Sequence, residues 1–209
     1  MQILRRLIRH TAAAGLVALG LALAPHGVAA GPLDLDAPVK AESLPEKKLT
    51  EAGLYITSRQ AARVLEEHAN VAFVEVRTPA EVALIGHATM LDAHIPVGFM
   101  DPTHRYSAKH GTYAMTPNPD FVKEFKAWLK SDAAKWIDTV LVSCRSRSRS
   151  KLAIDILLKA GVDDVALYSV VDGFEGDKNE NGVRNVNGWR NAGLPWTYKI
   201  RPGLWPGHN

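Results

Sequence analysis

The apolar positions of this chain follow two different periods, which predict strands alternating with helices. Residues 71–76 and 139–142 are unbroken β-branched or apolar runs, typical of strands buried on both faces. Residues 164–167 predict another short buried strand. Segments between these runs have apolar residues three or four positions apart, which is the spacing of one helix face. Strands that alternate with helices predict right-handed crossovers and a parallel sheet.

Capping signals place the starts and ends of the helices. Residues 57–60 form a capping box, and residues 78–81 repeat this start signal with Pro79 in the first turn. A further helix is expected after Asn118-Pro119, and Gly161 is placed to end the helix that begins near residue 150. The apolar face of the helix after Asn118-Pro119 comprises Phe121, Val122, Phe125, Trp128 and Leu129.

The first thirty residues have the pattern of a cleavable export signal. Arg5, Arg6 and Arg9 precede an apolar stretch over residues 12–24, and residues 28–30 are small enough for cleavage near Ala30. The apolar stretch is shorter than the roughly 20 residues that span a bilayer. We therefore expect a periplasmic or secreted protein that is not embedded in the membrane after cleavage. The residues around the Arg pair match a twin-arginine signal poorly, which favours ordinary secretion.

Export changes the interpretation of the charge. Removing the three arginines of the signal from the 25 basic residues leaves 22, equal to the 22 acidic residues. A neutral chain gives no reason to expect a nucleic-acid partner. The remaining sequence predicts a linker or N-terminal arm over residues 31–54, one domain over residues 55–198 and a C-terminal tail over residues 199–209.

Cys144 is the only cysteine, and it lies between a predicted strand and a predicted helix. A lone cysteine in an oxidising compartment forms no internal disulfide, so it is inert, paired with a partner's thiol, or kept for chemistry. Backbone N–H groups at a helix N-terminus and nearby cations lower a thiol pKa to roughly 3.5–7.5. The alternative is a structural thiol that behaves as a small hydrophobe. The residues after the cysteine are Arg145, Ser146, Arg147, Ser148, Arg149 and Ser150.

Several motifs, taken together, resemble the rhodanese family of sulfurtransferases. The loop from Cys144 to Arg149 has the length of the rhodanese active-site loop, with Arg147 in place of a small residue. Glu75 and Arg77 lie where rhodaneses have Asp-Val-Arg before a Pro-Ala-Glu helix start. The other matching segments are His94-Ile95-Pro96, residues 171–174 with Asp172 in place of a Gly, and residues 188–196.

The resemblance implies a single α/β rhodanese-like domain, with a mostly parallel five-stranded sheet and helices on both faces. It also implies catalysis by Cys144, which would carry sulfur from thiosulfate or a similar small anionic donor to cyanide, a thiol or a partner protein. Arg145 and Arg147 would bind the donor within the loop of Ser146 and Ser148. Arg149 would close the loop, against Glu75. Neither a metal nor an organic cofactor is implied.

Glu75 and Arg77 are expected to give structural support, and an Arg77–Glu81 pair is possible because these residues are four apart. His94 is interpreted as structural, because sulfur exchange uses a thiolate and not a proton shuttle. The long segment over residues 100–118 has no period, so it predicts a loop that covers the cysteine or contacts a partner.

Two alternative functions of the whole chain and two possible local metal sites remain. The chain could be a non-catalytic sulfur-carrier or anion-binding module that acts with a partner protein. A phosphatase is disfavoured, because a related phosphatase family places its loop arginine where this chain has Ser150. A metal site from His104 and His110 lacks further ligands. Residues 177–182 imitate a calcium loop, but the twelfth position is Gly188, so an Asn-Gly turn is favoured.

Overall fold

The computed structural model describes residues 32–146 and 148–208. Its central sheet has five strands in the order β1-β10-β9-β2-β4, and every neighbouring pair is parallel. The strands are β1 (Tyr55–Ile56), β10 (Ala166–Val170), β9 (Thr139–Ser143), β2 (Val71–Glu75) and β4 (Ala93–His94). The expected α/β fold with a five-stranded parallel sheet is therefore confirmed. The predicted export signal lies outside the described residues.

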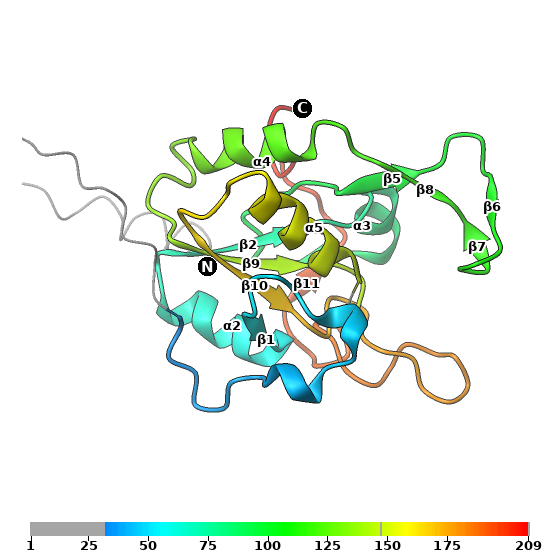
Figure 1. Ribbon diagram of the computed structural model, residues 1–209, viewed down its shortest axis with the longest axis horizontal. Helices are drawn as coiled ribbons and strands as arrows, with labels where there is room; N and C mark the ends of the chain where they lie inside the picture. The colour runs from blue at the N-terminus through cyan, green and yellow to red at the C-terminus, as the bar shows by residue number, and fades with distance from the viewer. Residues whose placement is uncertain (1–31, 147, 209) are drawn as a thin grey trace, which may run out of the picture.

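Helices cover both faces of this sheet (Figure 1). They are α2 (Ser58–Glu67), α3 (Pro79–Ile85), α4 (Phe121–Leu129) and α5 (Ser148–Lys159). Val142 of β9 belongs to the same apolar cluster as Phe125 of α4 and Ile154 of α5. Leu141, the preceding residue of β9, belongs to a second cluster with Leu65 of α2. Successive side chains of β9 therefore enter clusters on opposite faces of the sheet, as the strand period of two requires. Because both faces are buried, the central strands are apolar without interruption.

The predicted helix starts are confirmed by two complete capping boxes. Thr57 and Gln60 exchange hydrogen bonds before α2, and Thr78 and Glu81 do the same before α3. Within the described part of the chain, no helix is both long and apolar enough to cross a membrane.

One predicted strand has different bounds in the structure. The sequence predicted a strand over residues 164–167, whereas β10 runs from Ala166 to Val170. Its pairing partners decide these bounds, because β10 is hydrogen-bonded to β9 from Ala166 to Ser169 and to β1 at Ser169 and Val170. Ser169 is polar and buried, so the apolar pattern alone ended the prediction too early.

The segment before β1 packs on the domain. It contains two short 3-10 helices, Ala41–Ser43 and Glu46–Lys48, and Leu35 is buried in the same cluster as α2. The backbone N–H of Leu33 donates to the Tyr168 hydroxyl at 2.6 Å. The N-terminal arm therefore contributes to the core instead of hanging free.

The segment after residue 198 also packs on the domain, at the edge of the sheet. Leu204 has 1% of its surface exposed, and its backbone oxygen accepts a hydrogen bond from the His94 N–H at 2.7 Å. Trp205 lies near the rings of His94 and Phe99. The C-terminal segment thus continues the hydrogen bonding of the edge strand β4. Nearby, β3 (His87–Ala88) pairs antiparallel with β11 (Trp196–Thr197).

The region expected to be a loop is instead a two-stranded β-ribbon. Its strands are β5 (Gly98–Met100) with β8 (Met115–Pro117), and β6 (Tyr106–Ser107) with β7 (Thr112–Tyr113), all antiparallel. The ribbon projects from the domain beyond α3 (Figure 1). The prediction of a loop was wrong because most ribbon side chains are exposed, and an exposed ribbon shows no apolar alternation.

The packing of the C-terminal segment predicts a stability effect for Leu204. We expect Leu204→Ala to lower the free energy of unfolding by about 2–5 kcal/mol, the usual cost of a buried Leu→Ala change. The matched change Leu84→Ala, at a side chain that is 79% exposed on α3, should alter it by less than about 0.5 kcal/mol. Urea denaturation followed by circular dichroism measures both. Equal effects would show that the C-terminal segment does not pack in solution.

Candidate active site

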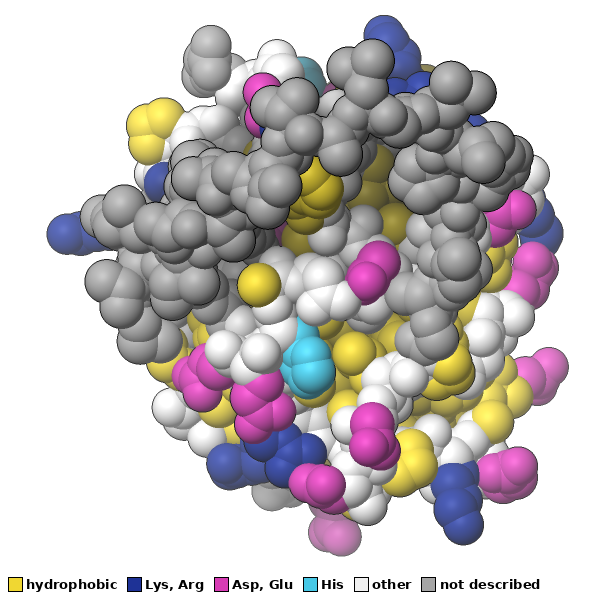
Figure 2. Space-filling view, turned by 90° about the vertical axis from the view of Figure 1, so that its left-hand side faces the viewer, with side chains coloured by type: hydrophobic (Ala, Val, Ile, Leu, Met, Phe, Trp, Pro, Cys, Tyr) yellow, Lys and Arg dark blue, Asp and Glu magenta, His cyan; other side chains and the backbone are white. Residues whose placement is uncertain are grey.

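The parallel strands end at one edge of the sheet, and this edge carries the candidate site. Cys144 directly follows β9, the central strand. Register places Glu75 of β2 beside Ser143 of β9 on one side and beside His94 of β4 on the other. The loop after β10 lies on the opposite flank of Cys144. Figure 2 shows the other end of the sheet, where the described surface mixes charges of both signs with apolar side chains.

The thiol of Cys144 is buried against the Ser150 hydroxyl, which in turn meets the Ser169 hydroxyl. Only 1% of the residue is exposed, and Sγ is a hydrogen-bond donor to Ser150 Oγ at 3.6 Å. Ser169 Oγ in turn donates to Ser150 Oγ at 3.2 Å. Ser150 comes from α5 and Ser169 from β10, so the fold brings together two elements around the sulfur. The sequence contained no signal for Ser169.

The backbone of the cysteine loop is held by the segment after β10. Phe174 N–H donates to the Cys144 oxygen at 2.9 Å, and Glu175 N–H donates to the Arg145 oxygen at the same distance. Gly173 has φ +61°, and a Cβ there would lie 2.5 Å from the Cys144 oxygen. Only glycine allows this approach of two backbones. The turn at Gly173 therefore sets the position of the loop.

Asp172 fixes this turn from the other side. Its carboxylate accepts hydrogen bonds from both the N–H and the hydroxyl of Ser58 at 2.8 Å, and from the Gly188 N–H at 3.2 Å. Burial raises the pKa of Asp172, and the hydrogen bonds from Ser58 oppose that rise. Although this residue departs from the glycine of the rhodanese pattern, it ties the turn to the start of α2.

Arg149 closes the loop against Glu81. Its Nη1 and Nη2 atoms bond the two carboxylate oxygens of Glu81 at 2.5 and 2.6 Å. The expectation that Arg149 pairs with Glu75 was therefore wrong, because the first turn of α3 brings Glu81 to α5. Burial raises the pKa of Glu81, but Arg149 outweighs it and lowers the pKa to about 2. Burial lowers the pKa of Arg149, but Glu81, with a contribution from Cys144, raises it above its usual range.

Glu75 and Arg77 form a second, fully buried pair beside the first. Arg77 Nε lies 2.9 Å from Glu75 Oε2, and Arg77 Nη2 donates to the Gly86 oxygen at 2.9 Å. The guanidinium lies 4.4 Å from the ring centre of Phe174. The suggested Arg77–Glu81 pair is thus absent, because Arg77 turns into the core while Glu81 faces α5. Burial raises the pKa of Glu75, and Arg77 opposes this effect.

The remaining loop residues have different environments. Arg145 Nε bonds Glu175 Oε2 at 2.5 Å, and the Arg145 side chain is still partly exposed. Ser146 is buried, and Ser148 begins α5. Arg147 lies outside the described residues. Both described arginines of the loop are therefore already paired with carboxylates, which the alternating Arg-Ser sequence did not reveal.

His94 lies at the same edge, but two strands away from Cys144. Its Nε2 is 2.7 Å from the Arg77 oxygen, and the ring is buried. Burial lowers the pKa of His94 to about 4, so its imidazole is neutral at pH 7. Because a carbonyl only accepts hydrogen bonds, Nε2 carries the proton of this neutral ring.

Comparisons with known proteins give matches among solved structures only. No family model and no curated protein matches the chain. The crystal structure of Rv0390 from M. tuberculosis is 27% identical, covers 69% of this chain and 96% of its own, and has a TM-score of 0.51. A thiosulfate sulfurtransferase from Pseudomonas aeruginosa is 17% identical over 74% of this chain and 23% of its own, with a TM-score of 0.47. A polysulfide-sulfur transferase homodimer from Wolinella succinogenes is 16% identical over 74% and 84%, with a TM-score of 0.40.

The sheet order and the cysteine loop after the central strand agree with the fold that the sequence resemblance implied. The chain has the rhodanese fold. In this rhodanese-like domain, the cysteine loop is enclosed by α3, α5 and the turn after β10.

The calcium-like segment of the rhodanese-like domain is a hairpin. Asp177 Oδ2 lies 2.9 Å from the Lys48 ammonium, which takes the place of a metal cation. Asn179 Oδ1 accepts from the backbone N–H groups of Asn181 and Val183, and Gly182 has φ +79°. The favoured Asn-Gly turn is confirmed. Across residues 32–146 and 148–208, no group of three or more His, Cys, Asp or Glu side chains could hold a metal ion.

The Arg149–Glu81 pair predicts a pH-dependent contribution to stability. Because the pKa of Glu81 is lowered from 4.5 to about 2, its contribution is present above pH 4.5 and is lost as the pH falls toward 2. We expect Glu81→Gln to lower the free energy of unfolding by about 2–3 kcal/mol at pH 7, with the difference shrinking toward pH 2. Urea titrations between pH 7 and pH 2.5 measure this. The exposed control Glu66→Gln should differ little at any pH, and a pH-independent loss in Glu81→Gln would contradict the pair.

Proposed function

We propose that this protein is an exported sulfurtransferase that moves sulfane sulfur through a persulfide on Cys144. The observation that carries the proposal is the position of Cys144. Its thiol lies after the central strand, against Ser150 in the first turn of α5, where it interacts electrostatically with Arg149. A helix N-terminus and a nearby cation both favour the thiolate, which is the nucleophilic form of cysteine.

In the first half-reaction, the Cys144 thiolate attacks the outer sulfur of thiosulfate. A new bond forms between Sγ and that sulfur, the sulfur–sulfur bond of thiosulfate breaks, and sulfite leaves with the bonding electron pair. The product is a persulfide anion on Cys144. Backbone N–H groups of the cysteine loop would stabilise this charge, as an oxyanion hole does for oxygen.

In the second half-reaction, the persulfide gives its outer sulfur to an acceptor. Cyanide attacks the outer sulfur, thiocyanate leaves, and the Cys144 thiolate is restored. A thiol acceptor reacts in the same way and leaves as a persulfide. No net oxidation or reduction of the protein occurs over the two steps, so no further electron carrier takes part.

The buried state of Cys144 adds a requirement to this mechanism. With 1% of the residue exposed, a donor reaches Sγ only after the segment around Arg145 and Ser146 shifts. Arg145 pairs with Glu175 at the mouth of this loop and is the most exposed of its described cations. An anionic donor would compete with Glu175 for the Arg145 guanidinium, and such competition would favour the shift at the moment of binding.

The first test is sulfur loading of Cys144. Intact mass spectrometry of the reduced mature protein after thiosulfate treatment should show a gain of one sulfur atom, reversed by cyanide. Cys144→Ser should remain folded and gain none, because it lacks the nucleophile. Sulfur transfer that survives in Cys144→Ser would overturn the mechanism. Absence of loading by thiosulfate, mercaptopyruvate and a persulfide alike would favour a non-catalytic module with a structural thiol. The mass of the mature chain also tests cleavage near Ala30.

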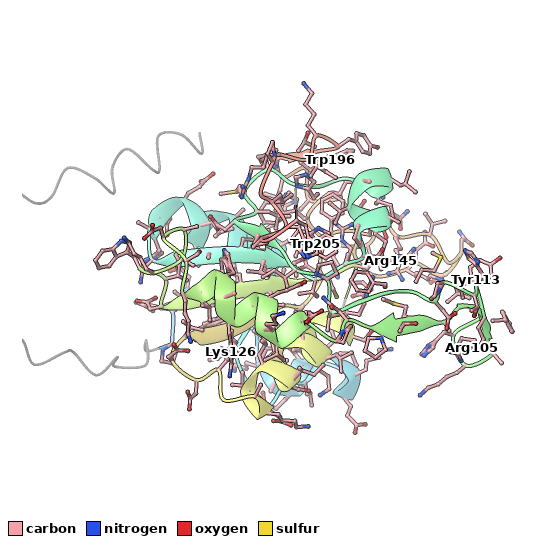
Figure 3. All side chains as sticks on the ribbon, turned by 90° about the horizontal axis from the view of Figure 1, so that it is seen from above. Arg105, Tyr113, Lys126, Arg145, Trp196 and Trp205 are labelled. Carbon is pink, nitrogen blue, oxygen red and sulfur yellow. The ribbon has the colours of Figure 1, made fainter. Side chains whose placement is uncertain are left out.

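A second candidate function is supported by the β-ribbon. A sulfur carrier that acts with a partner protein needs a docking surface near its cysteine. The ribbon carries two cross-strand pairs of exposed side chains, Met100 with Met115 and Tyr106 with Tyr113. Figure 3 shows Tyr113 and Arg105 toward its far end. The charged ribbon residues are Asp101, Arg105 and Lys109, and Arg105 pairs with Asp101 at 3.1 Å. The ribbon is therefore weakly basic, so the complementary partner surface would be apolar at its centre with some acidic side chains.

The ribbon predicts a difference between small and protein acceptors. The double variant Tyr106→Ser/Tyr113→Ser should load from thiosulfate and unload to cyanide at the wild-type rate. Its transfer to reduced exported proteins of the source organism should slow at least threefold, because the docking side chains are lost. Loss of the loaded mass over time measures this transfer. The control Trp136→Ser/Tyr198→Ser removes two aromatics that are exposed elsewhere. Equal slowing in both double variants would rule out docking by the ribbon.

A further inference from the structure

A groove lies beside the candidate active site, under the C-terminal segment. Its volume is about 610 Å³, within the usual range for small-molecule sites. Pro79 of α3 and His94 of β4 form one side, and residues 200–205 with His208 form the other. Ile200, Pro202 and Trp205 make most of that second side apolar. Neither the cysteine loop nor the ribbon contributes to this lining.

The apolar wall is held in place by its own contacts. Trp205 Nε1 donates to Glu124 Oε2 at 3.3 Å, and His208 Nε2 lies 3.1 Å from Glu124 Oε1. The rings of Trp205 and His208 stack with their centres 3.9 Å apart. Figure 3 places Trp205 on this side of the domain, over the sheet edge. A wall fixed in this way needs little ordering when a ligand binds.

His94 contributes a polar atom to the sheet side of the groove. His94 is 4% exposed, and its Nε2–H is used by the Arg77 carbonyl. Its Nδ1 has no hydrogen-bond partner among the described residues and is not one of their fully buried unpaired atoms, so solvent reaches it. In the neutral ring with a proton on Nε2, Nδ1 is a hydrogen-bond acceptor. The groove thus offers an acceptor to a ligand.

The charged side chains around the groove already have hydrogen-bond partners within the fold. The Arg201 guanidinium donates to the backbone oxygens of Leu91 and Asp92 at 3.1 and 2.6 Å. The carboxylate of Glu124 faces Trp205 and His208. Because the lining is otherwise mostly apolar, a charged ligand would lose its hydration there, which is costly. An uncharged ligand does not meet this cost.

We propose that this groove binds a small, uncharged organic molecule whose apolar body lies against Trp205 and whose single hydrogen-bond donor bonds His94 Nδ1. Alcohols, phenols and protonated thiols have this chemistry. The site is separate from the sulfur site, because β2 lies between β4 and β9 and two strand spacings are about 10 Å. The inference does not depend on sulfur transfer by Cys144.

Phenol and anisole test the proposal, since both have the same aromatic ring and only phenol has a donor. Calorimetric titration of the full mature chain at pH 7 should show saturable phenol binding, about threefold to tenfold tighter than anisole binding. His94→Phe should remove this preference, because it removes the acceptor. Ile200→Trp, at a side chain that is 52% exposed, should fill the groove and weaken phenol binding at least tenfold without affecting folding.

The control Val186→Trp adds the same ring at an exposed position outside the groove and should bind phenol as the wild type does. Sulfur loading of Cys144 by thiosulfate serves as an independent measurement, and we expect it to be unchanged in Ile200→Trp. Three results would overturn the proposal: no saturable phenol binding, equal affinities for phenol and anisole, or unchanged phenol binding in Ile200→Trp. None of them bears on the sulfurtransferase.

Discussion

The buried ion pair between Arg77 and Glu75 connects the sheet to everything that surrounds Cys144. Two charges in a protein interior cost several kcal/mol unless each finds a partner and hydrogen bonds. Arg77 meets this need with the Glu75 carboxylate, the Gly86 oxygen and the ring of Phe174. Phe174 then bonds the backbone of Cys144. These contacts therefore fix the end of β2 and the end of α3 relative to the cysteine loop.

A second pair gives the site its electrostatic character. Arg149 is held by both carboxylate oxygens of Glu81, and Glu81 also caps α3. The guanidinium is thus held in one place, where its charge interacts with Cys144. Arg77, Arg145 and Arg149 therefore each have a carboxylate partner near the cysteine loop.

Three segments outside the central sheet pack on or extend from this rhodanese-like domain. The N-terminal arm covers the α2 side, the ribbon extends from the edge that carries Cys144, and the C-terminal segment extends β4. The ribbon forms an exposed surface with aromatic and basic side chains. The C-terminal segment forms a recessed, mostly apolar groove. A macromolecule and a small molecule could therefore approach the same edge without competing for contacts.

The sequence by itself determined the alternation of strands and helices, both capping boxes, the place of Cys144 before α5 and the resemblance to rhodaneses. These features depend on residues close together in the chain, where periodicity and capping chemistry act directly. Only the tertiary structure decided the partners of Arg77, Arg145 and Arg149, the hydroxyls near the thiol, the ribbon and the C-terminal packing. Those contacts join residues up to more than a hundred positions apart, and their side chains follow no local period. Which carboxylate meets which arginine depends on how α3, α5 and the turn after β10 pack around β9.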